Sequence, residues 1–238
     1  MLDPATGLTE LTVEGVRDAA ETNNSANWDG VDCALYFDNN EKPENSRVEF
    51  IQLKYSVTGQ NKSWTLARFC SSTKKTGNNS VARRLADAFK GAIKGRKPRQ
   101  VEASLSIKLV TSQPIAKKLQ GSMAKAACSK LHGDDYDSLK RATGLGKNQL
   151  IQFCKLLVLE GGESARAELR EQNTKEISEL VLSPVKDMAD NLRVRIQELL
   201  GPEGNRTVKR DTVLSWFNLG RGQGLFPCEP ELEPLSEA

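Results

Sequence analysis

The amino-acid sequence predicts an α/β (α+β) protein, in which a mixed sheet flanked by helices is followed by an all-helical appendage. Short segments that alternate apolar and polar residues, as strands do, are confined to the part of the chain before residue 112. Beyond that point apolar residues recur at helical spacing. The 238 residues, 38% hydrophobic and 27% charged, are enough for one folded core and a smaller addition.

Four segments have the pattern of strands. The first three are expected over residues 8–16, 31–37 and 47–55. A polar loop that contains a proline joins the second of these to the third, so we expect the two to form an antiparallel hairpin. The fourth strand is expected over residues 102–111, where apolar residues alternate with serine and lysine.

The remaining elements are expected to be helices. Ser80 is a suitable N-cap for a helix that has one apolar and one cationic side and that ends at Gly95. A short helix is expected over residues 64–69, and Pro114 suits the first turn of a helix that reaches residue 128. Further helices, with no strand among them, are expected over residues 135–143, 147–160, 164–182, 184–200 and 211–219.

These elements suggest three parts of the chain. Residues 1–120 would form the sheet with its helices, and residues 121–224 the helical appendage. Residues 225–238 are rich in proline and glutamate, which is typical of a linker or a tail.

Composition excludes several classes of protein. The five cysteines are scattered and odd in number, which argues against a disulfide framework and against zinc-binding pairs. His132 is the only histidine, so two-histidine metal sites are excluded and catalysis by a Ser–His or Cys–His pair is disfavoured. The first residues carry neither a basic flank nor an apolar signal core, and no apolar stretch reaches membrane-spanning length, so we expect a cytoplasmic protein.

Charge is distributed unevenly along the chain. Residues 1–59 contain eleven acidic residues against four Lys and Arg, whereas residues 60–118 contain fourteen Lys and Arg against two acidic residues. A cationic block of this kind fits a surface that attracts phosphate backbones, although such runs are often only solvated faces.

The third strand carries polar residues where a buried strand should be apolar. Gln52 and Lys54 are two residues apart, so they share one face of the strand near its end. Asp32 lies near the start of the preceding strand, and in an antiparallel hairpin this start lies beside the end of the next strand. The three side chains can therefore converge on one point.

This combination of residues suits hydrolysis of a phosphodiester assisted by Mg²⁺ or Mn²⁺. Carboxylate and amide oxygens are hard ligands for such an ion, and a lysine beside it can orient a water molecule or stabilise a phosphate. The simpler alternative is that Asp32 and Lys54 form an ordinary ion pair while Gln52 satisfies a backbone group. The spacing alone leaves both interpretations open.

The segments GVDCALYF, at residues 30–37, and RVEFIQLKYS, at residues 47–56, resemble the PD-(D/E)xK nuclease superfamily. They are most similar to the double-stranded-DNA nuclease domains of bacterial antiphage proteins, namely STAND ATPases and effectors linked to cyclic-oligonucleotide signalling. The resemblance covers about residues 8–120 and implies a restriction-endonuclease-like sheet. It makes Asp32 the metal-binding aspartate, Lys54 the catalytic lysine and Glu14 an additional acid ligand. Gln52 occupies the metal-binding position where the family usually has glutamate.

The resemblance implies a Mg²⁺-dependent DNA endonuclease of antiphage defence with little sequence specificity. Residues Lys74, Lys75, Arg83 and Arg84 would grip the backbone of double-stranded DNA. A fused or separate STAND ATPase or sensor would control the activity, and the active form would be a homo-oligomer. Two alternatives are a DNA-binding module of the same fold without turnover, and a protein-interaction module formed by residues 121–238.

Overall fold

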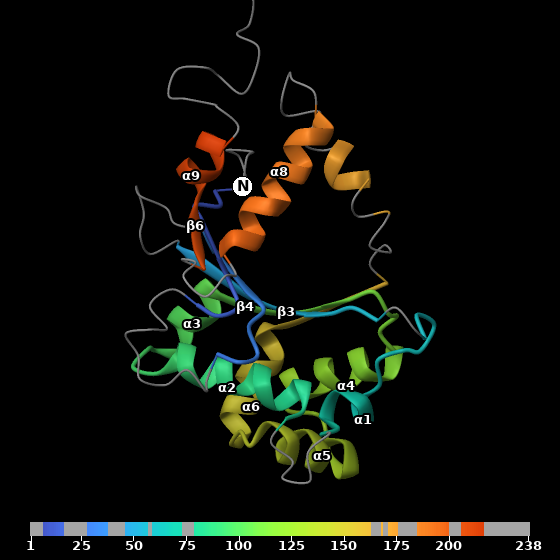
Figure 1. Cartoon of the computed structure of the whole chain (residues 1–238). Coiled ribbons are helices and arrows are strands. Elements are labelled where there is room, and N and C mark those ends of the chain that lie inside the picture. Colours follow the sequence, from blue (N-terminus) through green and yellow to red (C-terminus); the bar gives the residue numbers. More distant parts are fainter. Residues whose placement is uncertain are drawn as a thin grey trace, which may run out of the picture.

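The computed structural model has a mixed sheet with helices on both sides (Figure 1), so the predicted α/β class is confirmed. The order across the sheet is β5-β4-β3-β2-β1-β6 within the described residues. The strands are β1 (Glu10–Val13), β2 (Cys33–Phe37), β3 (Arg47–Lys54), β4 (Leu105–Thr111), β5 (Leu157–Gly161) and β6 (Thr207–Lys209). The structure describes residues 7–16, 28–37, 46–56, 59–72, 79–162, 168, 171–175, 185–199 and 206–216.

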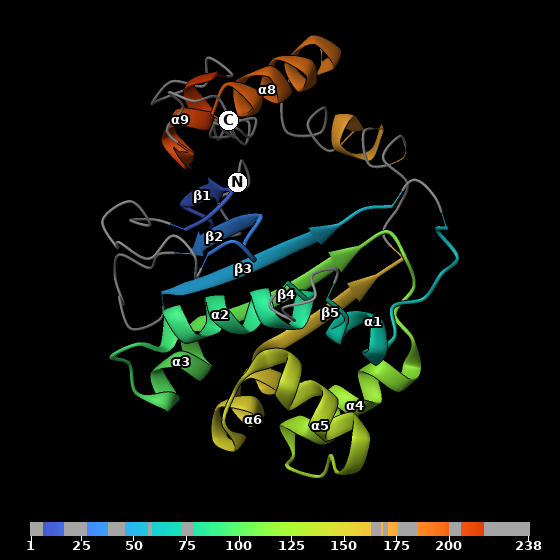
Figure 2. The same cartoon turned by 60° about the horizontal axis from the view of Figure 1, so that its bottom comes forward.

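Strand directions place several strand ends along one edge of the sheet. Strand β2 is antiparallel to both of its neighbours, β1 and β3, which confirms the predicted hairpin, whereas β4 and β5 run parallel to β3. Lys54, Thr111 and Gly161, the last residues of β3, β4 and β5, lie in one register row. The arrowheads of these strands point the same way in Figure 2. We call this side, where β2 also begins, the carboxyl edge.

Helices cover the two faces of the sheet unequally. Helices α8 (Val185–Leu199) and α9 (Arg210–Trp216) lie on one side of the sheet in Figure 1, and the larger group lies on the other. This larger group comprises α1 (Leu66–Cys70), α2 (Val81–Ile93), α3 (Pro98–Ser104), α4 (Lys117–Ala127), α5 (Gly133–Thr143) and α6 (Lys147–Leu156).

The hydrophobic core lies between the sheet and the larger group of helices. Strand residues such as Ile107 and Leu109 are fully buried there, together with Phe89 of α2 and Phe153 of α6. The rings of Phe89 and Phe153 meet edge to face at 5.7 Å between centroids. The opposite face of β3 is more open, because Leu53 keeps 40% of its surface exposed.

Helix α2 begins and ends where the sequence predicts. The side chain of Ser80 accepts a hydrogen bond from the N–H of Arg83, which caps the first turn. Gly95 has a φ of +75° just beyond the helix, a conformation that glycine adopts without strain. The buried side of the helix contains Leu85 and Phe89, as the spacing indicates.

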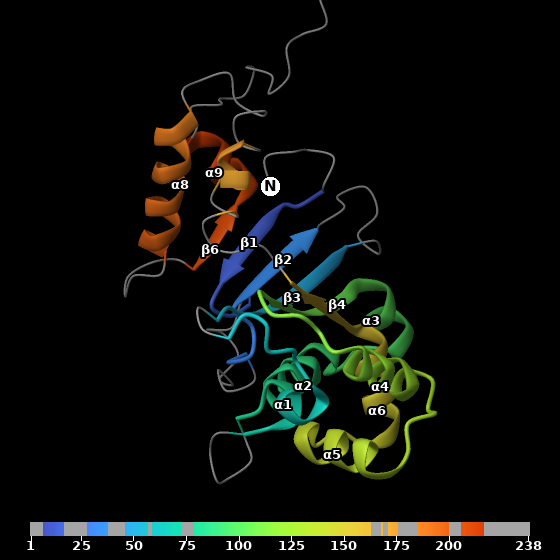
Figure 3. The same ribbon diagram turned by 90° about the vertical axis from the view of Figure 1, so that its right-hand side faces the viewer.

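The prediction that no strand follows β4 was wrong at two places. Strand β5 continues directly from α6 and pairs with β4, and β6 pairs with β1 (Figure 3). The segment LVLEG of β5 is a short apolar run, which periodicity cannot distinguish from the end of a buried helix. Strand β6 is three residues long and pairs with a strand almost 200 positions earlier. The sheet therefore extends beyond the boundary predicted at residue 120.

Two local predictions also need correction, and two other predicted segments lie wholly or mostly outside the described residues. Residues 98–104, whose end was expected to start the fourth strand, form helix α3. Pro114 precedes α4 by three residues, and its carbonyl accepts a hydrogen bond from the N–H of Trp64 at 2.8 Å. The tail at 225–238 and most of the helix predicted over 164–182 are not among the described residues. In the part of the chain that the structure describes, no helix has the length and apolar character to cross a membrane.

Candidate active site

Asp32 lies at the carboxyl edge, directly before β2. Its backbone N–H donates to the carbonyl of Ile51 at 2.9 Å, and its carboxylate Oδ2 accepts from the N–H of Leu53 at 2.6 Å. The carboxylate of Asp32 is therefore hydrogen-bonded to the peptide group that joins Gln52 to Leu53. The predicted proximity of Asp32 to the end of β3 is confirmed at the level of the backbone.

Close packing holds the loop before Asp32 against α2. Trp28 meets Phe50 edge to face, with 5.5 Å between ring centroids, and its ring also lies against Gly91. A Cβ atom on Gly91 would come within 2.9 Å of that ring, and one on Gly30 within 2.6 Å of the backbone of Arg84. Because both glycines allow approaches that any larger residue would prevent, they fix the segment that carries Asp32.

Gln52 is fully buried, and its side chain has no hydrogen-bond partner. Neither Oε1 nor Nε2 makes a hydrogen bond, and among the described residues no other buried side chain has an unpaired polar atom. A buried polar group without a partner costs about 1–3 kcal/mol of stability. Such a group in a folded protein needs an explanation, and a ligand or an ordered water molecule is the usual one.

Lys54 is half-buried at the end of β3. It is two residues beyond Gln52, so the strand places both side chains on the same face of the sheet. In the parallel pair of β3 and β4, Lys54 lies opposite Thr111. Its ammonium group makes no ion pair with a described acidic residue.

The simpler interpretation of these three residues does not hold among the described residues. It requires an ion pair between Asp32 and Lys54, and neither residue is within ion-pair distance of a described partner of opposite charge. It also requires Gln52 to satisfy a backbone group, and the amide of Gln52 bonds to none. The three groups are brought to one edge of the sheet without neutralising one another.

Sequence reasoning missed a hydrogen-bonded network beside Lys54. The hydroxyl of Thr111 accepts from Trp64 Nε1 at 3.1 Å and from the N–H of Gln113 at 3.2 Å. Arg68 donates to Gln113 Oε1 at 2.6 Å and lies 4.1 Å above the ring centre of Trp64. The one available signal was the pair of polar residues that ends the fourth strand. The network fixes the end of β4 next to Lys54.

Glu14 also lies at the carboxyl edge, where β1 ends. Its N–H donates to the carbonyl of Asp32 at 2.7 Å. Its carboxylate, in a side chain 58% exposed, lies 3.8 Å from a guanidinium nitrogen of Arg206. No sequence signal marked Arg206, because its position depends on the unexpected strand β6. Glu14 as an additional metal ligand stays a prediction.

The predicted DNA-binding residues have different environments. Arg83 is paired with Asp87 at 2.9 Å on the side of α2 that faces α5. Arg84 donates from Nε to the side chain of Asn79 at 2.8 Å, and its backbone adjoins Gly30 near Asp32. Lys74 and Lys75 lie outside the described residues.

The donor atoms at this edge suit a hydrated divalent cation. Asp32 offers a carboxylate whose second oxygen makes no hydrogen bond to a described residue, and Gln52 offers an unpartnered amide oxygen. Mg²⁺ keeps several water ligands and commonly binds proteins through one or two oxygen donors. No cluster of three or more acidic, histidine or cysteine ligands occurs among the described residues, so water would have to complete the coordination of such an ion.

Among the described residues, neither cysteine nor histidine adds a reactive group at this edge. Burial, reinforced by the charge of Asp32, raises the pKa of the Cys33 thiol to about 11. This thiol therefore remains protonated at neutral pH and is a poor nucleophile. His132 is exposed directly before α5, in the layer of helices.

No family model matches this chain, and no curated protein matches it. The function is therefore inferred from the geometry of the carboxyl edge and from the sequence motif that it contains.

Proposed function

We propose that the protein is a Mg²⁺- or Mn²⁺-dependent nuclease that hydrolyses phosphodiester bonds of double-stranded DNA. The observation that carries the proposal is the buried amide of Gln52, which has no partner. It lies beside a peptide group that is bonded to the carboxylate of Asp32. A carboxylate oxygen and an amide oxygen at one edge of the sheet, with Lys54 on the same strand face as Gln52, would be able to hold a cation at a phosphate.

The strand topology supports a restriction-endonuclease-like core. Three antiparallel strands are followed by helices that cross to a fourth strand, β4, parallel to the third. Asp32 then precedes the second strand, and Gln52 and Lys54 end the third. The PD-(D/E)xK resemblance of the sequence assigns its metal-binding and catalytic roles to these same positions.

The chemistry would consist of hydrolysis at phosphorus. A water oxygen attacks the phosphorus, one P–O bond breaks, and the departing oxygen takes up a proton, so that one product carries the phosphate and the other a hydroxyl. When bound, the cation would supply Lewis acidity and a water molecule of lowered pKa. Asp32 and Gln52 would hold the cation. Lys54 would orient the attacking water or stabilise the additional negative charge on the phosphate oxygens.

Double-stranded DNA is the proposed substrate because of the cationic block, in which Lys and Arg outnumber acidic residues by fourteen to two over residues 60–118. Contacts between such residues and phosphates are strong at low salt and largely independent of base sequence. The resemblance places this activity in antiphage defence, with oligomerisation or a STAND ATPase or sensor partner as its control.

A plasmid-cleavage assay in Mg²⁺ or Mn²⁺ tests the site. We expect the Asp32→Ala and Lys54→Ala variants each to cleave at least about 10²-fold more slowly than the wild type. Lys130→Ala is the matched control, because Lys130 is an exposed lysine beyond the far end of α4, and it should cleave normally. Cleavage that persists in both site variants would remove the assignment of the site, and absence of cleavage by the wild-type chain with either metal would contradict the nuclease.

One observation favours a second function, DNA binding without turnover. The polar atoms of Gln52 are shielded from solvent as well as unpartnered, so a cation can reach them only if the edge opens. The Gln52→Glu variant separates the two functions by its unfolding temperature. If the site takes a cation, Mg²⁺ should raise this temperature more in Gln52→Glu than in the wild type, because the buried carboxylate then gains a partner. No effect of Mg²⁺ on either protein would favour the binding module.

A further inference from the structure

Arg206 reaches the carboxyl edge because of strand β6. This strand pairs antiparallel with β1, with Thr207 opposite Thr12, so that the preceding residue lies at the end of β1. The carbonyl of Arg206 accepts a hydrogen bond from the N–H of Val13 at 2.7 Å. Its position is therefore fixed by the sheet, although it is 174 positions after Asp32 in the sequence.

A short chain of contacts connects Arg206 to the candidate site. One of its guanidinium nitrogens donates to the carbonyl of Glu14 at 3.3 Å, and the other lies 3.8 Å from the Glu14 carboxylate. The N–H of Glu14 in turn donates to the carbonyl of Asp32 at 2.7 Å. Arg206 is thus separated from the proposed metal-binding aspartate by a single residue.

Glu14 makes these contacts in a conformation that is unfavourable for its type. Its φ is +53°, in the left-handed region, which costs a non-glycine residue about 1–2 kcal/mol. The turn is maintained by the two backbone contacts, one to Asp32 and one to Arg206. Strained residues of this kind are common at functional sites.

The ion pair between Arg206 and Glu14 is weak enough to be exchanged. Both side chains are more than half exposed, at 54% and 58%, and the contact distance of 3.8 Å is long. Exposed pairs of this kind contribute little to stability, since water and salt screen them. A phosphate, which offers several charged oxygens to the planar guanidinium, is a better partner than this carboxylate.

We propose that Arg206 binds a backbone phosphate of the DNA and thereby positions the strand at Asp32 and Lys54. This inference rests on the proposed nuclease function and extends it to a residue outside the PD-(D/E)xK motif. In the absence of DNA, Glu14 holds the guanidinium beside the site. When DNA binds, the phosphate takes the place of the carboxylate of Glu14.

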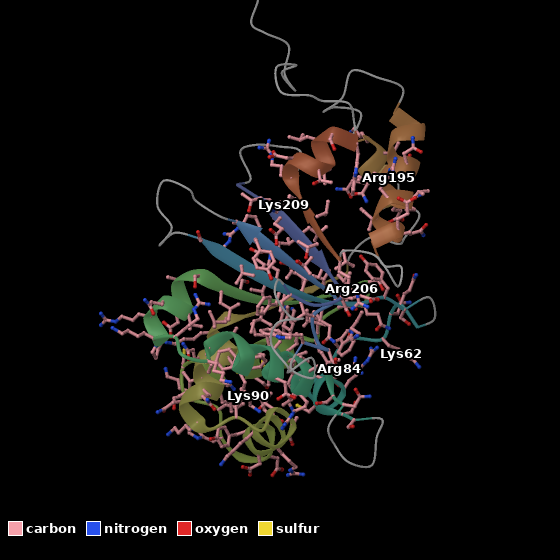
Figure 4. All side chains as sticks on the ribbon, turned by 60° about the vertical axis from the view of Figure 1, so that its left-hand side comes forward. Lys62, Arg84, Lys90, Arg195, Arg206 and Lys209 are labelled. Carbon is pink, nitrogen blue, oxygen red and sulfur yellow. The ribbon has the colours of Figure 1, made fainter. Side chains whose placement is uncertain are left out.

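Other cations at the same edge favour a polyanion over a small anion. Arg84 adjoins Gly30, two residues before Asp32. Lys62 lies in the loop whose Gly59 carbonyl accepts a hydrogen bond from Gln113, just after β4. Figure 4 labels Arg206, Lys62 and Arg84 on three different segments of the chain, and Arg195 on α8. Cations contributed by three separate segments match a backbone that carries a phosphate at every nucleotide.

The test measures DNA binding separately from cleavage. All proteins carry Lys54→Ala, so that the duplex stays intact, and binding to a fluorescent DNA duplex is followed by anisotropy at several salt concentrations. We expect Arg206→Ala to weaken binding roughly 10-fold and to reduce the salt slope by about one. Arg206→Lys should restore most of the slope, because it keeps the charge. Both effects should be independent of base sequence.

Arg195→Ala is the matched control. Arg195 is 57% exposed and pairs with Glu198 at 3.5 Å, so its exposure and ion pairing resemble those of Arg206, but it lies on α8. Its substitution should leave the salt slope unchanged. An equal loss in the two variants, or an unchanged slope in Arg206→Ala, would overturn the proposal.

Glu14→Gln distinguishes this role from that of a metal ligand. If Glu14 holds Arg206, Glu14→Gln should bind DNA at least as tightly as the wild type, because the guanidinium is then free to meet the phosphate. Loss of cleavage with unchanged DNA binding would make Glu14 a metal ligand, contrary to the role given to it here. DNA binding that depends on Arg206 in a protein that never cleaves would refute the nuclease and leave Arg206 as a residue that binds the DNA backbone. Absence of DNA binding would refute both.

Discussion

Two polar regions of the molecule, the carboxyl edge and the contact between α2 and α5, differ in whether their polar and charged groups have partners. At the helix contact, the carboxylate of Asp87 forms ion pairs with Arg83 at 2.9 Å and with Lys90 at 3.2 Å. At the carboxyl edge, Asp32 and Lys54 form no ion pair with a described residue, and the side-chain amide of Gln52 has no hydrogen-bond partner among these residues either. Satisfied groups stabilise a contact between elements, whereas groups left unsatisfied at a cost in stability are expected where a ligand binds.

Adjacent residues of one helix differ in their partners, since Arg83 pairs with the charged Asp87 and Arg84 donates to the neutral side chain of Asn79. Arg83 is directed towards α5, where it approaches Gly144 closely, and Arg84 adjoins the segment that carries Asp32. Figure 4 shows Arg84 and Lys90 at separate places along α2. Charge along the sequence therefore does not decide the role of a residue, because the partner that the fold supplies does.

The largest expected effect comes from disturbing the support of the carboxyl edge. Gly30→Ala places a Cβ atom 2.6 Å from the backbone of Arg84, which cannot move as a flexible side chain can. We expect the free energy of unfolding to fall by about 1–3 kcal/mol and DNA cleavage to fall with it.

Urea denaturation measures this change, with Gly121→Ala in α4 as the control. A Cβ atom there meets no atom within 4 Å, so this variant should keep or gain stability by up to about 1 kcal/mol. Equal stabilities of the two variants would mean that the loop before Asp32 is not fixed against α2.

A smaller effect of opposite sign is expected at Gln52. Methionine has a similar volume without the polar groups, so Gln52→Met should raise the free energy of unfolding by about 1–2 kcal/mol in the absence of metal. The same variant should lose metal-dependent cleavage. A gain in stability together with a loss of activity is characteristic of a residue retained for function.

Gln113→Met is the control for that measurement. Gln113 is also buried, but its side chain bonds to Arg68 and to the carbonyl of Gly59, both at 2.6 Å. Its replacement should destabilise the protein, because it removes two hydrogen bonds, one of them from a charged guanidinium. If Gln52→Met were as destabilising as Gln113→Met, the amide of Gln52 would have a partner in solution, and the contrast between the two regions would fail.

The smallest expected effect separates Arg83 from Arg84. Arg83→Ala should lower the free energy of unfolding by about 0.5–1 kcal/mol, since it removes a half-buried ion pair, and should leave DNA binding unchanged. Arg84→Ala should leave the free energy of unfolding nearly unchanged and should weaken DNA binding. Thermal unfolding and anisotropy on the same two variants provide the comparison, and a loss of DNA binding in Arg83→Ala would support its predicted role at the DNA.

Several elements followed from the sequence because their signals are local. The cap of Ser80, the helical spacing of α2 and the alternation in β3 and β4 depend on neighbouring residues, and all four appear at or near their expected positions. The hairpin of β2 and β3 was predicted because a polar loop separates two apolar runs. Strands β5 and β6 were missed because their identity depends on distant partners, β4 and β1.

The candidate site likewise has features that the sequence predicted and features that it did not. A strand of period two was enough to place Gln52 and Lys54 on one face, and hairpin geometry was enough to place Asp32 beside them. The lack of a partner for Gln52 was not predictable, since it depends on everything that packs around the residue. Arg206 and the network around Thr111 likewise depend on segments that only the folded chain brings together.

The sequence by itself determined the class of the fold, its central hairpin and the three residues at the end of that hairpin, because periodicity and short-range geometry act over a few residues. Only the tertiary structure decided which polar groups are satisfied and which are not. It paired Arg83 with Asp87, left the amide of Gln52 unpartnered, and brought Arg206 to Glu14 from almost 200 positions away. Hydrogen bonding and burial depend on neighbours in space, and the order of residues along the chain does not specify those neighbours.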